Sequence, residues 1–556
     1  MNNLLIQFVH WCRRKFAIEV DGASLGFFRI VWGGLMIVEV SRKLEKATGL
    51  YSADYFHFKY SLTPFVEPLP ENWMVFAEIW LLIISAAMVM LGLGFRFFAA
   101  VFFLFYTHLF LIEKMYFNNH FYLTSLLAFL LILTSADQCF SVKSWLQRKK
   151  KQSNPGHTVP FWNLIILRAQ IVIVYFFGGV SKLQGDWLQG EPLRHWFGNK
   201  PADQIKAPLI WFPEIIRQEW FVWMLSYGGM IFDFAIGFFL LNRKTFWPAA
   251  TLVILFHVTN YSLFKIGLFP IIGVSLLALF FQPHWPRPIL GKRFQKTPIQ
   301  NDGFIAKNAS RLATPAVTAF VLVYIAVQAL LPFRTLKYEG DPSWSEVGHY
   351  YSWRMMLRDK DAYLKFFFNP PEAERILEVS DQKPKIAKSH VTKMVKNPQM
   401  ILSYTHALDR SFKEMGIDGV EIRVASIVSL NGRPYQLMID PEVDLAKASY
   451  GFFEVPDWVI PLEKNIRPGL YPKSSDDRKS AIERVFAEEA KPILSTIRRK
   501  KFKAPLEELL EKVNHQAAEK YRNEKAKSGA PRLQDDPPTK TESEASNPAS
   551  GSPKDL

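Results

Sequence analysis

The chain has 556 residues, of which 49% are hydrophobic and 15% aromatic, with 47 Phe and 16 Trp. Its net charge of +16 does not indicate nucleic-acid binding, because the basic residues lie in short loops between apolar segments and in the last quarter, and no zinc-finger, RRM or helix-turn-helix pattern occurs. The two cysteines, Cys12 and Cys139, are too few and too far apart for a CxxC metal or redox site.

Mostly apolar segments of about 17 to 23 residues, enough to cross a bilayer, recur through the first 332 positions. Gly267 and Pro270 interrupt one of them, which a membrane helix tolerates when its neighbours satisfy the freed carbonyls. Basic residues precede the first segment without a short apolar stretch and cleavage site, so we expect a retained span there. We predict nine spans, at residues 24–41, 73–93, 97–113, 119–136, 161–181, 220–241, 246–262, 264–282 and 311–332.

The loop charges set the orientation of these spans. Five basic stretches belong inside by the positive-inside rule: Arg13 to Lys15, Arg96, Arg148 to Lys151, Arg243 with Lys244, and the loop from Arg287 to Arg311. The N-terminus is therefore inside and the C-terminal part outside. Both cysteines then lie inside, where no disulfide is expected. The predicted outer ends of the spans carry Asn118, His120, Lys182 and His257.

A soluble outer domain is predicted after Pro332, where hydropathy falls. Residues 421–428 and 435–439 are rich in β-formers and flank Asn431-Gly432, which predicts a β-hairpin. More strands are expected at about 362–380, and amphipathic helices at about 478–520. The expected fold is a multi-pass α-helical membrane bundle of about nine spans (1–332), a β-containing α+β outer domain (333–524) and a disordered tail (525–556).

The stretch from Tyr175 to Trp187 ends an apolar span with two glycines and Lys182. One interpretation of Lys182 is a membrane anchor whose stem lies along lipid while the ammonium reaches the headgroups. In the other, Lys182 faces a partly dry cavity, where desolvation disfavours the charged form and makes the amine available as a base. The segment alone leaves both open.

Other polar residues interrupt the apolar spans, where they are costly and therefore candidates for function, although helix-bridging hydrogen bonds explain most such residues. No nucleophile elbow, HExxH, P-loop or GxGxxG motif occurs, and no metal is expected because the histidines lie on different elements. The polar residues inside the spans are His108, Arg168, Gln170, Asp233 and His257.

Several collinear motifs closely resemble the vitamin K-dependent gamma-carboxylase family over roughly residues 20 to 450. They are Asn118 to Phe129, Val159 to Asn163, Leu167 to Trp187, Phe256-His257, Ser262 to Phe269, Tyr351 to Met356 and Ile439 to Asp444. The resemblance implies oxidation of vitamin K hydroquinone to its 2,3-epoxide by O2, coupled to the capture of CO2 by glutamate side chains to give γ-carboxyglutamate. This is a carbon–carbon lyase reaction of the peptidyl-glutamate 4-carboxylase type.

The resemblance also implies roles for particular residues. Lys182 lies in the motif of the base that deprotonates the hydroquinone. His120 and Asn119 are expected to bind or orient the hydroquinone oxygens, with His120 counted as catalytic as well. Tyr175 is expected to line the glutamate or quinone pocket, and His257 to give polar support.

The implied partners are a glutamate-containing protein or peptide, membrane lipids and the quinone, with no nucleic acid. Unlike the mammalian members, this chain has few cysteines, lacks their further β-rich region and has Ser181 where they have a lysine, which leaves the substrate-docking surface open. We expect a bacterial inner-membrane protein, or an ER protein if the source is eukaryotic. Two alternatives are a hydroquinone epoxidase without protein carboxylation and a non-catalytic quinone-binding or transport-like protein.

Overall fold

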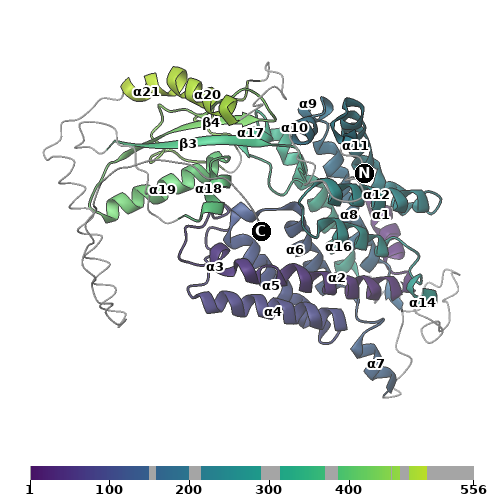
Figure 1. Cartoon of the computed structure of the whole chain (residues 1–556). Coiled ribbons are helices and arrows are strands. Elements are labelled where there is room, and N and C mark those ends of the chain that lie inside the picture. Colours follow the sequence, from purple (N-terminus) through teal and green to yellow (C-terminus); the bar gives the residue numbers. More distant parts are fainter. Residues whose placement is uncertain are drawn as a thin grey trace, which may run out of the picture. The chain divides into compact units, whose positions relative to one another are not determined.

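The computed structural model describes residues 2–149, 158–198, 214–289, 314–369, 386–451, 454–463 and 475–496 (Figure 1). All of them belong to one compact unit. The tail predicted from residue 525 and the basic loop at 290–313 lie outside the described residues. The boundary predicted at residue 332 between a membrane part and an outer part stays a prediction.

Six helices in the described part of the chain are long and apolar enough to cross a membrane. Each coincides with a predicted span, so the multi-pass helical architecture is confirmed. They are α2 (Ala23–Ser41), α4 (Asn72–Leu91), α5 (Phe95–Ile112), α8 (Trp162–Ser181), α11 (Glu219–Leu241), and α16 (Pro315–Leu330) continued by the 3-10 helix η8 (Leu331–Lys337).

The other three predicted spans form helices that are shorter or more polar. Helix α6 (Asn119–Leu133) has only 15 residues, and α12 (Phe246–Leu263) carries His257 and Asn260. The predicted span 264–282 is broken: a connection precedes α13 (Phe269–Ser275) and the 3-10 helix η6 (Leu276–Leu279). Gly267 has a positive φ of 63° there, and Pro270 lies in the first turn of α13. The count of nine spans is therefore not confirmed.

Further short elements connect these helices. Helix α1 (Asn2–Phe16), which was not predicted, precedes the first span. Strands β1 (Glu19–Asp21) and β2 (Thr158–Pro160) pair antiparallel. The remaining elements are η1 (Leu44–Lys46), α3 (Ala47–Leu50), η2 (Lys114–Tyr116), α7 (Val142–Lys149), α9 (Gly185–Leu188), α10 (Leu193–Gly198), η5 (Ile215–Arg217), α14 (Pro286–Ile289) and α17 (Pro342–Ser345).

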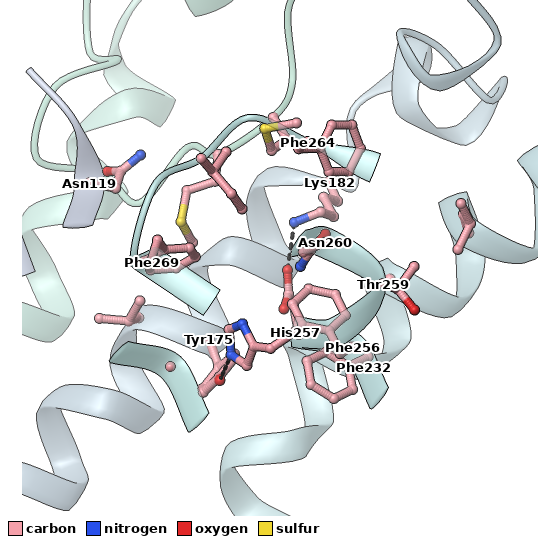
Figure 2. Close-up of a pocket in the computed structure, with 18 of the residues that line it drawn as sticks. Asn119, Tyr175, Lys182, Phe232, Phe256, His257, Thr259, Asn260, Phe264 and Phe269 are labelled. Carbon is pink, nitrogen blue, oxygen red and sulfur yellow. Dashed lines mark hydrogen bonds and ion pairs between the residues drawn. The ribbon is translucent and has the colours of Figure 1, made fainter. Parts of the chain in front are cut away.

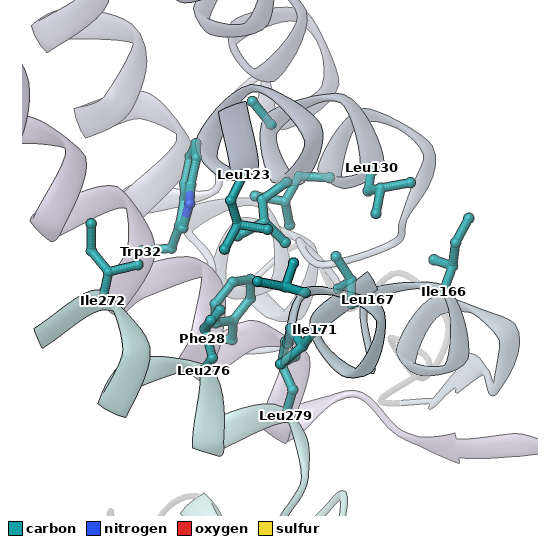
Figure 3. Packing of buried hydrophobic residues seen from close by; sticks show 14 of the residues in the cluster. Phe28, Trp32, Leu123, Leu130, Ile166, Leu167, Ile171, Ile272, Leu276 and Leu279 are labelled. Atoms are coloured by element: carbon teal, nitrogen blue, oxygen red, sulfur yellow. The ribbon is translucent and has the colours of Figure 1, made fainter. Parts of the chain in front are cut away.

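Buried apolar side chains hold the membrane helices together (Figure 3). The cluster includes Phe28, Trp32, Leu123, Leu130, Leu167, Ile171, Ile272, Leu276 and Leu279, from α2, α6, α8, α13 and η6. In a membrane the hydrophobic effect contributes little to helix association, so helices associate through close packing, which small residues allow. A Cβ at Gly179 of α8 would lie 2.5 Å from the backbone nitrogen of Phe234 in α11. This close approach brings the end of α8 beside Asp233.

The outer part contains a three-stranded antiparallel sheet in the order β3-β4-β5. The strands are β3 (Lys360–Asn369), β4 (Glu421–Leu430) and β5 (Gln436–Ile439). Between β4 and β5, Asn431 and Gly432 both have positive φ, 53° and 73°, as their residue types favour. The predicted hairpin is therefore confirmed. The predicted strand near 362–380 is observed as far as residue 369, and residues 370–385 are outside the described part.

Helices cover both faces of this sheet (Figure 1). Helices α18 (Lys388–Met394) and α19 (Pro398–Glu414), which were not predicted, pack with Val424 and Val428 on one face. On the other, Ala425 and Ile427 meet α20 (Ser475–Val485) and α21 (Lys491–Thr496), which a short π-helix, η9 (Phe486–Ala490), joins. The alternation along β4 is that of a strand buried on both sides. The predicted amphipathic helices are thus observed up to residue 496.

Candidate active site

A cavity of about 840 Å³ lies where α8, α11 and α12 meet the segment of residues 349–358 (Figure 2). Its lining is mainly apolar and aromatic, with a small number of polar groups, as is typical of pockets for small organic ligands. The polar residues of the lining include Asn118, Asn119, His120, Tyr175, Lys182, Asp233, His257, Asn260, His349, Arg354 and Arg358.

Lys182 is the C-cap residue of α8 and points into this cavity (Figure 2). Its Nζ lies 2.5 Å from Oδ2 of Asp233 in α11, 3.3 Å from the carbonyl oxygen of Gly178 and 5.1 Å from the centre of the Trp187 ring. The side chains of Lys182 and Asp233 are only 6% and 5% exposed. A snorkelling anchor would extend along lipid to the headgroups, so this geometry excludes the anchor interpretation.

Tyr175 lies two turns before Lys182 on the same helix. Its hydroxyl shares a hydrogen bond of 2.9 Å with Nε2 of His257 on α12. The His257 ring occupies the space above Gly273 of α13, where a Cβ would lie 2.2 Å from Nε2. Nδ1 of His257 is buried and has no partner among the described residues. The pair therefore joins three helices and keeps one imidazole nitrogen available.

Asn119 and His120 enter the cavity from the first turn of α6. Nδ2 of Asn119 donates to the carbonyl oxygen of Arg354 at 2.9 Å, while its Oδ1 is buried and has no partner in the described part of the chain. The His120 ring packs against Phe269 of α13, with 5.5 Å between ring centres. All five residues predicted for the site thus line one cavity, although their roles stay predictions.

The structure adds residues that the sequence did not predict for the site. Asp233 was predicted only as one of several span residues that could serve function or bridge helices, and it pairs directly with Lys182. Arg354, His349 and Arg358 come from beyond the membrane helices. Arg354 belongs to the matched motif from Tyr351 to Met356, so that motif was the one available indication of their part in the site.

The segment that carries these three residues has an unusual backbone. Tyr351, Trp353 and Met356 all have positive φ, between 56° and 59°, a conformation that bulky residues rarely adopt and that is concentrated at functional sites. Burial lowers the pKa of His349 to about 3, so its imidazole is neutral at physiological pH. Burial also lowers the pKa of Arg358 to about 10, which leaves that guanidinium charged.

Arg354 and Arg358 differ in how their charges are engaged. Arg358 forms an ion pair with Glu346, whereas Nη2 of Arg354 lies 4.0 Å from Oδ1 of Asp341. Nη2 of Arg354 donates to Oε1 of Gln184 at 2.6 Å and to Oγ of Ser343 at 3.3 Å. Nε of Arg354 is buried and without a partner among the described residues. Arg354 therefore offers the cavity a cation with an unused donor.

Asp186 joins the end of the membrane bundle to the outer sheet. Both carboxylate oxygens accept from Arg433, at 2.6 and 2.7 Å, and Oδ2 also accepts from Nδ2 of Asn431 at 2.8 Å. All three residues are buried. Because Asp186 is close to Lys182 in the sequence, this contact places the turn between β4 and β5 close to the cavity.

Other polar residues of the spans have structural partners instead. Nε of Arg168 donates to the carbonyl oxygen of Leu279 at 2.7 Å and satisfies the end of η6. Oε1 of Gln170 accepts from the Tyr324 hydroxyl at 2.6 Å. His108 pairs with Glu78 at 2.7 Å between α5 and α4. These three residues stabilise helix packing and are not part of the cavity lining.

Cys12 and Cys139 are both buried, and neither forms a disulfide bond. Within the described ranges, no three His, Cys, Asp or Glu side chains are grouped so that they could hold a metal ion. The polar groups that line the cavity include amine, carboxylate, amide, imidazole, phenol and guanidinium groups.

The fold and the site define a multi-pass membrane protein with a deep cavity between its helices and its outer part. Residues 18–285 match the HTTM domain family, and residues 313–465 match the lumenal domain of vitamin K-dependent gamma-carboxylase. Together these matches show that the chain belongs to the vitamin K-dependent gamma-carboxylase family. It is a membrane protein whose C-terminal domain lies on the outer side. No solved structure matches the chain.

Proposed function

We propose that this protein is a vitamin K-dependent gamma-glutamyl carboxylase, a carbon–carbon lyase of the peptidyl-glutamate 4-carboxylase type. It would couple oxidation of vitamin K hydroquinone to its 2,3-epoxide, with O2, to the addition of CO2 to glutamate side chains. The observation that carries this proposal is the buried Lys182–Asp233 pair on the wall of a large apolar cavity. The bound hydroquinone supplies the reducing equivalents and the strong base that the reaction requires.

The cavity fits a quinone in size and chemistry. Its volume of about 840 Å³ is within the range of small-molecule pockets, and its lining is mainly apolar. Oδ1 of Asn119 and Nδ1 of His257 are buried polar atoms without partners among the described residues. Buried polar atoms normally have hydrogen-bond partners, so these two are suited to ring hydroxyl groups. Asn119 and His120 would orient one side of the ring, and Tyr175 would hold His257 in place.

The cavity also has a side suited to an isoprenoid tail. Several of its apolar lining residues lie on the outer faces of α11 and α12 and are about half exposed. They are Met224 (49%), Ile231 (60%), Leu252 (48%) and Leu255 (59%). In a bilayer these side chains face lipid, and this supports entry of a lipid-soluble substrate from the membrane.

Lys182 would act as the base together with Asp233. An ammonium group accepts a proton only if it transfers one of its own, and the Asp233 carboxylate at 2.5 Å is placed to receive it. As Lys182 takes a proton from the hydroquinone hydroxyl, it would pass another to Asp233. The net charge of the site is unchanged by this relay, which matters where burial penalises an unpaired charge.

The glutamate substrate would approach from the outer side. Nε of Arg354 is a buried donor with no partner in the described part of the chain, and a carboxylate is the natural acceptor for it. His349 is neutral and would contribute a hydrogen bond but no charge. The apolar lining would exclude water, which otherwise quenches both the strong base and the carbanion.

A single assay tests the proposal and its two alternatives. Purified protein is given vitamin K hydroquinone, labelled bicarbonate and a glutamate-containing peptide. We expect label in the peptide together with epoxide. Epoxide without label would indicate an epoxidase alone, and neither product would indicate a non-catalytic quinone-binding protein.

A further inference from the structure

A second, smaller cavity lies beside the first. It measures about 50 Å³ and lies between η2, η8 and the segment of residues 346–351. Phe117 of the large cavity packs against two residues of the small one, with its ring centre 4.8 Å from that of Tyr350 and 5.3 Å from that of Tyr351. A void of this size has room for a small molecule but none for a quinone or a peptide side chain.

Lys114 lines this cavity and is only 4% exposed. Its backbone nitrogen donates to the carbonyl oxygen of Phe58 at 2.8 Å, which fixes the position of the residue. Its Nζ donates to Oε1 of Gln399 and lies 4.6 Å from the centre of the Tyr350 ring. Among the described residues, no carboxylate lies within ion-pair distance of this amine.

The neighbouring carboxylate of Glu113 is directed elsewhere. Its Oε1 accepts from the backbone nitrogen of Met115 at 2.9 Å, and its Oε2 accepts from that of Phe58 and lies 3.2 Å from Nδ1 of His57. Burial lowers the pKa of Lys114 to about 7, so a large fraction of the amine is neutral at physiological pH. A neutral amine carries the lone pair that a nucleophile requires.

The charged and titratable groups around Lys114 favour an added anion. Arg334 lines the same cavity and donates through Nη2 to the carbonyl oxygen of Tyr350. The carboxylate of Glu346 is already neutralised by Lys360, at 2.7 Å, and by Arg358. The other titratable groups are Tyr60, Tyr338, Tyr350, Tyr351 and Tyr450. Burial raises the pKa of Tyr60, Tyr350 and Tyr450, so these remain neutral.

We propose that Lys114 binds CO2 reversibly as a carbamate, with Arg334 stabilising the new anion. The lone pair of the neutral amine nitrogen forms a bond to the carbon of CO2, and one C=O π bond breaks so that its electron pair goes to oxygen. The nitrogen then loses a proton to solvent, and no oxidation state changes. The product is a carbamate anion in place of a neutral amine. Its use as a local CO2 supply rests on the proposed carboxylation, whereas carbamate formation itself does not.

The test traps the adduct directly in the full-length protein. Protein equilibrated with ¹³CO2, without quinone or peptide, is treated with triethyloxonium, which converts carbamates to stable ethyl esters, and the modified lysines are located by mass spectrometry. We expect the ¹³C ester at Lys114, its loss in Lys114→Met and its retention in Lys393→Met. At constant dissolved CO2, labelling should be greater at about pH 8 than at about pH 6, because the neutral amine increases through pH 7.

Lys393 is a suitable control because it lies nearby but is exposed, and its Nζ donates to the carbonyl oxygen of Met115 at 2.9 Å. Absence of label at Lys114 in folded wild-type protein would overturn the proposal, as would equal labelling of Lys393. Because the site is mapped in the wild type, misfolding of a variant does not affect the decision. If the protein carboxylates the peptide but shows no adduct at Lys114, only the carbamate proposal is wrong. If the adduct forms but the peptide is not carboxylated, only the proposed function is wrong.

Discussion

The Lys182–Asp233 pair makes a quantitative prediction about stability. Both side chains are almost fully buried and the charged atoms are 2.5 Å apart. Removing one partner of such a pair costs about 3–5 kcal/mol, because the other charge is left uncompensated, whereas replacing both by apolar residues is close to neutral. We expect Lys182→Met to lower the free energy of unfolding by about 3–5 kcal/mol. Lys182→Met with Asp233→Leu should recover most of this loss.

The measurement is reversible unfolding of the purified protein in mixed micelles, for the wild type, both single variants and the double variant. Lys265→Met is the control, because Lys265 is exposed and should change the free energy of unfolding by less than about 0.5 kcal/mol. If the effects of the two single substitutions simply add in the double variant, the side chains are not coupled. The ion pair, and the relay based on it, would then be wrong.

Three further predictions concern activity. Gly273→Ala should displace the His257 ring, because the new Cβ would lie 2.2 Å from Nε2, and should lower epoxide formation at least about tenfold. Gly185→Ala is the control: no atom lies within 4 Å of its new Cβ, so epoxide formation should not change. Arg354→Gln should raise the KM for the peptide about tenfold or more while epoxide formation without peptide changes little, because a charged hydrogen bond is lost. Asp233→Asn leaves the lysine without a proton acceptor, so epoxide formation should fall by about 10²–10⁴ while quinone binding persists. Epoxide formation that is unchanged in Gly273→Ala or in Asp233→Asn, or a KM that is unchanged in Arg354→Gln, would contradict these predictions.

Local sequence patterns were sufficient for much of the fold. The apolar length of α8 and α11 identified them as spans, and Asn431-Gly432 identified the hairpin because those residue types adopt positive φ most easily. The predicted span at 264–282 is helical only from residue 269 for a local reason as well, since Gly267 has a positive φ in the connection after α12 and Pro270 lies in the first turn of α13. Helix α19 was missed, although it has the apolar spacing of an amphipathic helix on the outer sheet.

The site was only partly predictable, because its key contacts join residues far apart in the chain. The motifs identified Lys182, Asn119, His120, Tyr175 and His257, and all of these line the cavity. The partner of Lys182 is 51 positions away, on a helix whose rotation no local pattern specifies. The contact of Asn119 with Arg354 spans 235 positions in the same way. Such pairs depend on how the helices pack, which propensity and periodicity do not describe.

The central claim is that Lys182 accepts a proton from the hydroquinone. Its most direct test is the rate of hydroquinone-driven epoxide formation by Lys182→Ala, with quinone binding measured in parallel to show that the cavity is intact. We expect the rate to fall by about 10²–10⁴, the usual contribution of a positioned base, while binding persists. Epoxide formation at the wild-type rate would show that Lys182 is not the base.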